Sequence, residues 1–418
     1  MSTTNDRTGR GRPVSRRTVL GGLAAGAAGA VGLGRAPWVL AAGAAAKSGP
    51  VEPKDAGAEI RQVTTEEYYQ SNIYCEVPYC SRHSRYFVYV RSNPNLKGNR
   101  SEVMAVELGT WRQERLDVTT GLGGVAISPA GVFYYLKRTG DGHLDLMRAD
   151  LEDGTPERVY RRKDERWIRS LGTISPDGRW YAGGVRAADD WSMFGIVLVD
   201  LRNGTERVID RDPFILNPHP QFDPGPRQRL MIQHNRGGTF TPDGKLERLV
   251  GEQGATLYVL SAPGGTRTEL PVGKPHTTSC TGHEAWIGTT GEMLLTVSAR
   301  GDYVPEKGNL LAVRAGGRAR VAAAGYRFNH VGVSRCGRVF SCDDWRPPYR
   351  IVLGSPHTGR TAVVCESGTQ PDRSQRTHPH AYLTPDLKWV IFNSNRSGFP
   401  HVYAARVPEG MIDELLAA

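Results

Sequence analysis

The chain is a succession of short apolar runs separated by turns rich in glycine and proline. In the run "WVIFNS", which begins at Trp389, Trp389 and Ile391 alternate with Val390 and Phe392, as in a buried strand. No long segment has the apolar spacing of an amphipathic helix. With 50 Gly and 27 Pro among 418 residues, the pattern predicts many strands joined by tight turns and disfavours a helical bundle.

A repeat organises these strands. Seven short turns are each followed by an aromatic or aliphatic run, as in "SPAGVFYYL", "SPDGRWYAGG" and "TPDLKWVIF". The second residues of the turns are Arg82, Pro129, Pro176, Pro224, Thr290, Arg335 and Pro385, which are 47, 47, 48, 66, 45 and 50 residues apart. This period predicts an all-β, seven-bladed β-propeller over residues 47–418. The long fourth interval contains "NRGGTFTPDGKLERL", which we expect to form a longer loop over one face.

Histidines recur just before these turns. They are His219, His283, His330 and the pair His378 and His380, which makes five of the 11 histidines in four blades. Because the loops at one end of a propeller converge on its axis, we expect these side chains to lie close together.

The segment "SQRTHPH" contains Gln375, His378 and His380. Two histidines separated by one residue point to the same side of an extended chain. Together with Gln375 and a third imidazole such as His283, they would offer several nitrogens and one neutral oxygen, a donor set that suits Mn²⁺, Zn²⁺, Ni²⁺ or Fe²⁺ better than Ca²⁺. The alternative, that the pair only bonds neighbouring loops, stays open.

The N-terminus predicts export. Arg16 and Arg17 directly precede a weakly hydrophobic run of Gly and Ala, and the small residues of "VLAAGAAAKS" follow. This is the layout of a twin-arginine signal over residues 1–46, removed on the way to the periplasm or the exterior. The alternative is a membrane anchor, but Arg35 interrupts the apolar run. No other segment is apolar enough to span a membrane.

Charge and cysteine content narrow the function. Residues 1–46 carry six Arg and one Asp, so the net charge falls from +10 to 10 − 5 = +5 without them, a balance compatible with an anionic substrate. No block of basic and aromatic residues suggests nucleic-acid binding. The six cysteines are too scattered for a disulfide framework or a Cys-x-x-Cys zinc site, although a disulfide between Cys75 and Cys80 is open.

Three segments resemble the oligogalacturonate lyase family. "QRTHPHAYLTPDLKWVIFNSNRSGFPHVYAARVPE" is similar to its C-terminal blade with a Gln-x-x-His-x-His motif, "SCTGHEAWIGTTG" to its "SCTHE" segment, and "NPHPQFDPGPRQRLMIQH" to its "HPIYRP…FCH" segment. A weak likeness extends over all seven blades. The resemblance implies cleavage of short α-1,4-linked galacturonate chains, or of a related oligouronide, by β-elimination.

The resemblance also implies roles for individual residues. Gln375, His378, His380 and His283 match the Mn²⁺ ligands, His234 best matches the general base with His219 as the second candidate, and Arg236 and His330 are candidates for contacting substrate. Arg236 is also compatible with an ordinary solvated loop cation. Two departures bear on these roles: Gly282 is inserted before His283, and "HNRGG" replaces the family's "HEGP".

Two other classes remain. A non-catalytic, TolB-like propeller would use its blades as a docking surface, with the histidines bonding loops and no ion retained. A propeller hydrolase would need a nucleophile elbow, and the chain has no Gly-x-Ser-x-Gly motif. The sequence leaves the oligomeric state and the exact uronide open.

Overall fold

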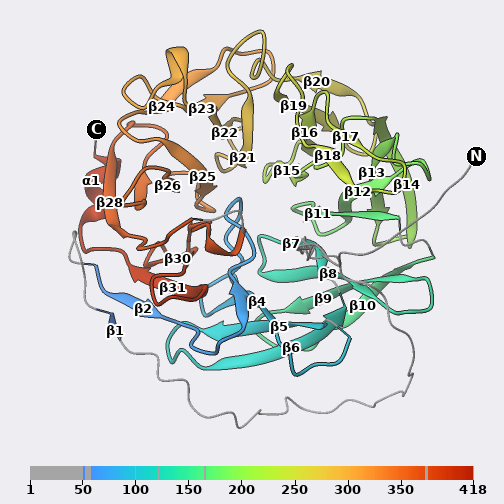
Figure 1. The fold of residues 1–418 in the computed structure, drawn as a ribbon, viewed down its shortest axis with the longest axis horizontal. Coiled ribbons are helices and arrows are strands. Elements are labelled where there is room, and N and C mark those ends of the chain that lie inside the picture. The colour runs from blue at the N-terminus through green and yellow to red at the C-terminus, as the bar shows by residue number, and fades with distance from the viewer. Residues whose placement is uncertain are drawn as a thin grey trace, which may run out of the picture.

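The computed structural model describes residues 50–51, 58–98, 100–120, 122–163, 166–371 and 375–417. Within them, four-stranded antiparallel sheets follow one another around a central axis as the blades of a propeller (Figure 1). The predicted all-β, seven-bladed β-propeller is therefore confirmed. The predicted export signal, residues 1–46, lies outside the described residues.

The strands of the first three blades are β3 (Tyr69–Ser71), β4 (Tyr86–Ser92), β5 (Arg100–Glu107) and β6 (Gln113–Thr120); β7 (Gly123–Ile127), β8 (Val132–Arg138), β9 (Leu144–Asp150) and β10 (Glu157–Arg162); and β11 (Trp167–Ile174), β12 (Trp180–Arg186), β13 (Phe194–Asp200) and β14 (Thr205–Asp212). In each blade the first strand lies next to the axis and the fourth at the rim.

The fourth to sixth blades contain β15 (Gln221–Phe222), β16 (Arg229–Asn235), β19 (Ala255–Ser261) and β20 (Arg267–Glu269); β21 (Cys280–Trp286), β22 (Met293–Val297), β23 (Leu310–Val313) and β24 (Arg320–Ala323); and β25 (Phe328–Val333), β26 (Phe340–Asp344), β27 (Arg350–Gly354) and β28 (Thr361–Glu366). A single pairing of Ala255 with Cys280 joins β19 to β21 across the boundary between the fourth and fifth blades. A short 3-10 helix, η1 (Gly301–Tyr303), lies between β22 and β23.

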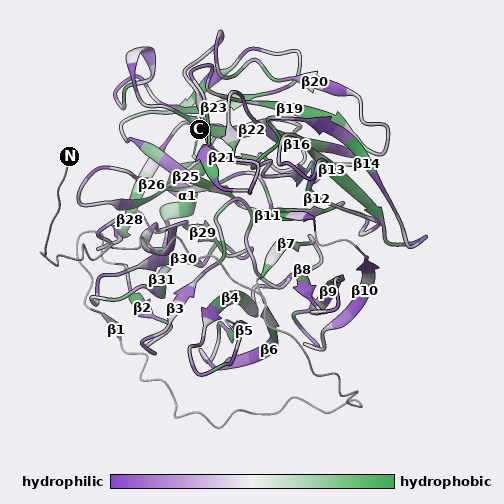
Figure 2. Ribbon diagram, turned by 45° about the vertical axis from the view of Figure 1, so that its right-hand side comes forward, coloured by the Kyte–Doolittle hydropathy of each residue, from purple (hydrophilic) through white to green (hydrophobic). Residues whose placement is uncertain are grey.

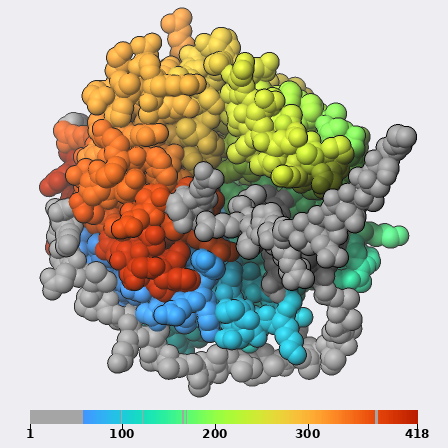
Figure 3. Space-filling view, in the orientation of Figure 1, coloured from blue at the N-terminus to red at the C-terminus, as the bar shows by residue number. Residues whose placement is uncertain are grey.

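The last blade is closed by the beginning of the described chain. Its strands β29 (Tyr382–Leu383), β30 (Trp389–Ser394) and β31 (His401–Arg406) are completed by β2 (Ile60–Gln62), which pairs with β31, and β1 (Pro50–Val51) adds an edge. The first blade thus lies against the last (Figure 3). The remaining helices are η2 (Gln375–Thr377) and α1 (Met411–Leu416).

The predicted turns join the first and second strands of the blades. In the second blade the N–H of Gly131 donates to the carbonyl of Ser128, and in the third that of Gly178 donates to Ser175. Middle strands such as β13 are buried along their whole length, whereas rim strands such as β10 are hydrophilic (Figure 2). This gradient is expected when blades pack face to face and only their outer edges meet water.

The long fourth interval is an insertion, as the sequence predicts. It forms the hairpin of β17 (Thr239–Phe240) and β18 (Leu246–Arg248), and the residues that follow it, Leu249 and Val250, return toward the axis. The disulfide left open between Cys75 and Cys80 is not formed: both residues are buried free thiols. Cys80 packs among apolar side chains of the first blade, whereas the carbonyl of Cys75 lies against Gly332 in the sixth. No helix in the described ranges is long and apolar enough to cross a bilayer.

Candidate metal centre

Four histidines occupy equivalent positions in four consecutive blades. In each of these blades one backbone N–H at the end of the first strand donates across the turn, and the donors are Asp223, Ile287, Ser334 and Thr384. In the fifth blade this donor lies three residues before Thr290, the second residue of the turn in the sequence pattern. His219, His283, His330 and His380 each lie four residues before the donor of their blade: 223 − 219, 287 − 283, 334 − 330 and 384 − 380 all equal 4. The repeat therefore brings imidazoles from separate blades to the axis, as the sequence predicts for the loops.

Local irregularities aim these side chains. In β21 the pairing shifts between Cys280 and Glu284, and in β25 it shifts between Phe328 and Val331, so His283 and His330 both lie within a bulge. Bulges re-aim side chains near functional sites. Gly282, the residue directly before His283, adopts a φ of 89°. This left-handed conformation is readily open to glycine.

A second backbone feature orients His219 and His380. Each follows a proline and has a positive φ, 42° for His219 and 44° for His380. The carbonyls of Pro218 and Pro379 accept hydrogen bonds from second-strand N–H groups of their blades. A positive φ is uncommon for histidine and tends to occur where the surrounding structure demands it, often at a functional site.

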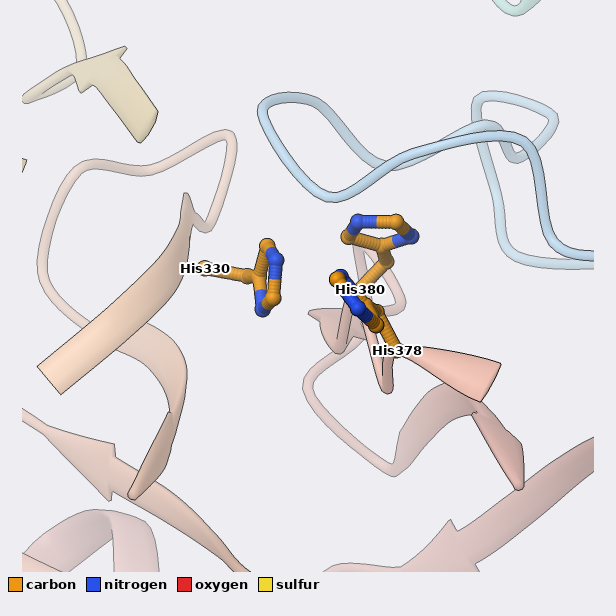
Figure 4. A group of neighbouring side chains, drawn as sticks. All are labelled: His330, His378 and His380. Carbon is orange, nitrogen blue, oxygen red and sulfur yellow. The ribbon is translucent and has the colours of Figure 1, made fainter. Parts of the chain in front are cut away.

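Three of the imidazoles form a compact cluster. Each of His330, His378 and His380 offers a ring nitrogen within 4.8 Å of the other two, and the three rings converge from β25 and from the segment before β29 (Figure 4). The ring of His283 lies beside that of His330, with 4.3 Å between the centroids. We call His283, His330, His378 and His380 the histidine cluster.

The chemistry of the histidine cluster fits a divalent transition metal. Both ring nitrogens of His380 are buried and have no hydrogen-bond partner among the described residues. Burial, followed by the neighbouring imidazoles, lowers the pKa of His380 and of His283 well below the usual value. These rings are therefore uncharged at neutral pH, with lone pairs that a cation can accept. Imidazole nitrogens suit Fe²⁺, Ni²⁺ and Zn²⁺, and an added carbonyl or water oxygen suits Mn²⁺.

Partners outside the cluster orient two of its rings. Asp343, which is fully buried, accepts hydrogen bonds from the backbone N–H of His330 at 2.7 Å and from Nδ1 of His330 at 2.8 Å. This favours the tautomer with the proton on Nδ1 and a lone pair on Nε2, which lies 3.4 Å from the side-chain nitrogen of Asn329. The Tyr74 hydroxyl lies 2.8 Å from Nδ1 of His283, and the Tyr74 ring also packs on that of His380, with centroids 4.6 Å apart.

A second titratable cluster adjoins the first. It consists of Glu76, from the loop between β3 and β4, His219 and Glu284, whose ligand atoms lie within 4.8 Å of one another. Glu76 Oε1 lies 2.5 Å from Nδ1 of His219. Burial acts to lower the pKa of His219, but the attraction of the Glu76 carboxylate outweighs burial and raises this pKa. For Glu284, burial raises the pKa to about 8. We call these residues the Glu–His–Glu cluster.

A cavity of about 1320 Å³ opens at the axis. The site residues on its wall are Tyr74, His219, His283, Gln375 and His380, and among described side chains its wall includes the guanidinium groups Arg100 and Arg376. Typical small-molecule pockets have volumes of about 300–1,000 Å³, so this one has room for more than one sugar. Arg376 lies over the Tyr69 ring at 4.1 Å.

Two of the residues selected from the sequence lie away from both the histidine cluster and the cavity wall. His234 faces the opposite side of β16 from Gln233 and Asn235, which line the cavity, and its Nε2 lies 2.8 Å from Asp212. The Arg236 guanidinium donates to the carbonyls of Gly254, Lys274 and Gln253. The structure thus brings together His219, His283, His330, His378 and His380, and Gln375 lines the same cavity, whereas His234 and Arg236 lie elsewhere.

Sequence reasoning missed four residues of the site: Tyr74, Glu76, Glu284 and Asp343. Glu284 and Asp343 carried at most a weak signal, because each is an acidic residue within a short blade strand. Tyr74 and Glu76 carried none, since they lie in an irregular loop of the first blade.

The fold and the site define a seven-bladed β-propeller with a histidine-lined cavity on its axis. No protein-family model matches the chain, and no curated protein matches it in sequence. Among solved structures it is similar to an oligogalacturonate lyase from Vibrio parahaemolyticus, at 18% identity and a TM-score of 0.67, with 87% of this chain and 97% of that chain covered. An oligogalacturonate lyase in complex with manganese gives 18% identity, a TM-score of 0.68 and the same coverage.

A third similar structure is the β-propeller domain of the Trilobed protease from Pyrococcus furiosus, with 12% identity, a TM-score of 0.50 and coverage of 85% of this chain and 99% of that one. At these identities the similarities establish the fold, and they agree with the family resemblance found in the sequence.

Proposed function

We propose that the protein is a metal-dependent lyase that cleaves short α-1,4-linked oligogalacturonates, or a related oligouronide, by β-elimination. The observation that carries the proposal is the cluster of four imidazoles beside a large axial cavity, with the buried ring nitrogens of His380 lacking partners among the described residues. A docking propeller would give these nitrogens ordinary hydrogen bonds to loops.

His378, His380 and Gln375 would hold the cation together with His283 or His330. Mn²⁺ is the ion we propose, on the family resemblance and on the manganese complex of a structurally similar lyase. A cation bound there would stabilise the negative charge that develops on the substrate carboxylate as the C5 proton leaves. Asp343 holds His330, and Tyr74 holds His283, in place for this task.

The C5 proton requires a base, for which we propose His219. Glu76 accepts the hydrogen bond from Nδ1–H, so the Nε2 lone pair is left to take the proton at the cavity wall. The Glu76 carboxylate also stabilises the imidazolium that forms. His234, the better match by sequence, bonds Asp212 and does not line the cavity.

The other carboxylates of an oligouronide need cationic partners. Arg376 and Arg100 line the cavity and replace Arg236 in this role in our proposal. Guanidinium groups bind carboxylates through two parallel hydrogen bonds, which makes them selective for planar anions. The volume of the cavity supports a substrate of several sugars.

The test uses three proteins: the parent, His378→Ala, and His143→Ala as a control at a distant turn. We expect His378→Ala to lose bound metal and most of the uronide cleavage, and His143→Ala to keep both. Full cleavage activity in a metal-free His378→Ala protein would refute the proposal.

We also propose export by the twin-arginine route to the periplasm or the exterior, on the basis of the signal in residues 1–46. N-terminal sequencing of protein recovered outside the cytoplasm tests this. A mature N-terminus near residue 47 is expected, and an intact, cytoplasmic chain would contradict it.

A further inference from the structure

The Glu–His–Glu cluster lies at the cavity boundary and has chemistry of its own. His219 lines the cavity, whereas Glu76 and Glu284 lie behind it. The exposed fractions are 3% for Glu76, 9% for His219 and 0% for Glu284. Three blades supply the three side chains, so the propeller itself holds one nitrogen and two carboxylates within reach of one point.

The carboxylate of Glu284 has no partner in this arrangement. Both of its oxygens are buried and make no hydrogen bond within the described part of the chain. No Lys or Arg of the described residues forms an ion pair with Glu76 or Glu284, and the one cationic partner in reach is His219. Buried carboxylates are costly unless they are paired or coordinate a metal.

Hydrogen bonding within the cluster leaves both carboxyl oxygens of Glu284 without a partner among the described residues. The bond between Glu76 and Nδ1 of His219 uses one carboxylate and one imidazole nitrogen. Gln221 lies close, but its side chain donates to the backbone carbonyl of Glu284 and not to the carboxylate. A cation would account for all three side chains at once.

We propose that Glu76, His219 and Glu284 form a second divalent-cation site, distinct from the histidine cluster. Two carboxylates and one imidazole are a common donor set for Zn²⁺ and Mn²⁺, and they neutralise a 2+ charge. Such a site would be more anionic than the histidine cluster, which contains no carboxylate.

The site has a consequence for activity, and this consequence rests on the proposed function. A cation bound at Nδ1 of His219 moves the ring proton from Nδ1 to Nε2, so that Nε2 can no longer accept the C5 proton. A cation at the histidine cluster would therefore activate the enzyme, and a cation at the Glu–His–Glu cluster would inhibit it.

The test counts bound cations and does not depend on activity. Protein stripped by a chelator is titrated with Mn²⁺ and, separately, with Zn²⁺ by calorimetry, and the bound metal is measured by elemental analysis. The variants are Glu284→Gln, Glu76→Gln and His378→Ala, with the exposed Glu269→Gln as the control. Thermal unfolding of each stripped variant verifies folding; Glu284→Gln is isosteric and replaces a group with no hydrogen-bond partner among the described residues, so no loss of stability is expected.

We expect two cations per chain in the parent and in Glu269→Gln, one in Glu284→Gln and in Glu76→Gln, and one in His378→Ala. A single cation that survives in Glu284→Gln and is lost in His378→Ala would overturn this inference and leave the proposed function intact. A single cation with the opposite behaviour would support this site and count against the histidine cluster.

Discussion

Replacing Asp343 by Asn tests whether the histidine cluster is built to bind a metal. Asp343 accepts two hydrogen bonds from His330, at 2.7 Å from the backbone N–H and at 2.8 Å from Nδ1. Asparagine has one oxygen and one NH₂ group, so one of these two donors must lose its acceptor. If it is Nδ1, the ring proton moves to Nε2 and that nitrogen can no longer bind a cation.

The expected magnitude follows from two independent considerations. A lost hydrogen bond to a buried charged group costs about 1.5–3 kcal/mol. Removing a carboxylate that orients a ligating histidine typically weakens metal binding about 10–100-fold, which corresponds to about 1.4–2.7 kcal/mol. We therefore expect the Mn²⁺ dissociation constant of Asp343→Asn to rise within that 10–100-fold range.

The assay is calorimetric titration of chelator-stripped protein with Mn²⁺. Asp344→Asn is the matched control, because Asp344 is the next residue and equally buried, but it bonds Arg346 and the N–H of Arg327. Asp344→Asn is expected to lower stability without changing Mn²⁺ affinity. Unchanged affinity in a folded Asp343→Asn protein would refute the assignment of His330 to the cluster that binds metal.

Three further predictions concern the base, the pH dependence of stability and the packing of the site. His219→Gln should lower the rate of uronide cleavage about 100- to 10,000-fold, the usual contribution of a general base, whereas an equally large loss in His234→Gln would contradict the assignment. Burial acts to raise the pKa of Asp212, but hydrogen bonds led by that from His234 outweigh it and lower the pKa to about 2. The resulting stabilisation is fully present above the unfolded-state pKa near 3.8 and is lost as the pH falls toward 2. Allowing for solvent screening, it amounts to about 1 kcal/mol. Denaturant titrations at several pH values should show this fall in the free energy of unfolding in the parent and not in Asp212→Asn. A Cβ added at Gly332 would lie 2.2 Å from the carbonyl of Cys75, so Gly332→Ala should cost about 1–3 kcal/mol in denaturant unfolding and displace the segment that carries Tyr74; parental stability would contradict this packing.

The fold and the convergence of the histidines were predictable because both follow from a repeat. A turn recurs in each blade, and in four blades a histidine shortly before the turn reaches the axis. The orientation of His234 was not predictable, because it depends on the register of β16. There the N–H of Gln233 donates to the carbonyl of Pro218, and the neighbouring residue points the other way.

The partners of the histidines were beyond the sequence for a different reason. Tyr74 and Glu76 lie in a loop without regular spacing, more than 140 residues before the histidines that they contact. Only the closure of the ring brings the first blade to that position. Asp343 lies in a strand whose other residues are buried, where the sequence alone does not distinguish a structural carboxylate from one that orients a metal ligand.

The most direct test of the central claim is the absorbance of the unsaturated product when the mature protein is mixed with digalacturonate and with trigalacturonate. We predict a rise in absorbance with Mn²⁺ that a chelator abolishes and that added Mn²⁺ restores. A flat trace with both substrates, from protein whose bound metal is verified by elemental analysis, would contradict oligogalacturonate β-elimination by this chain.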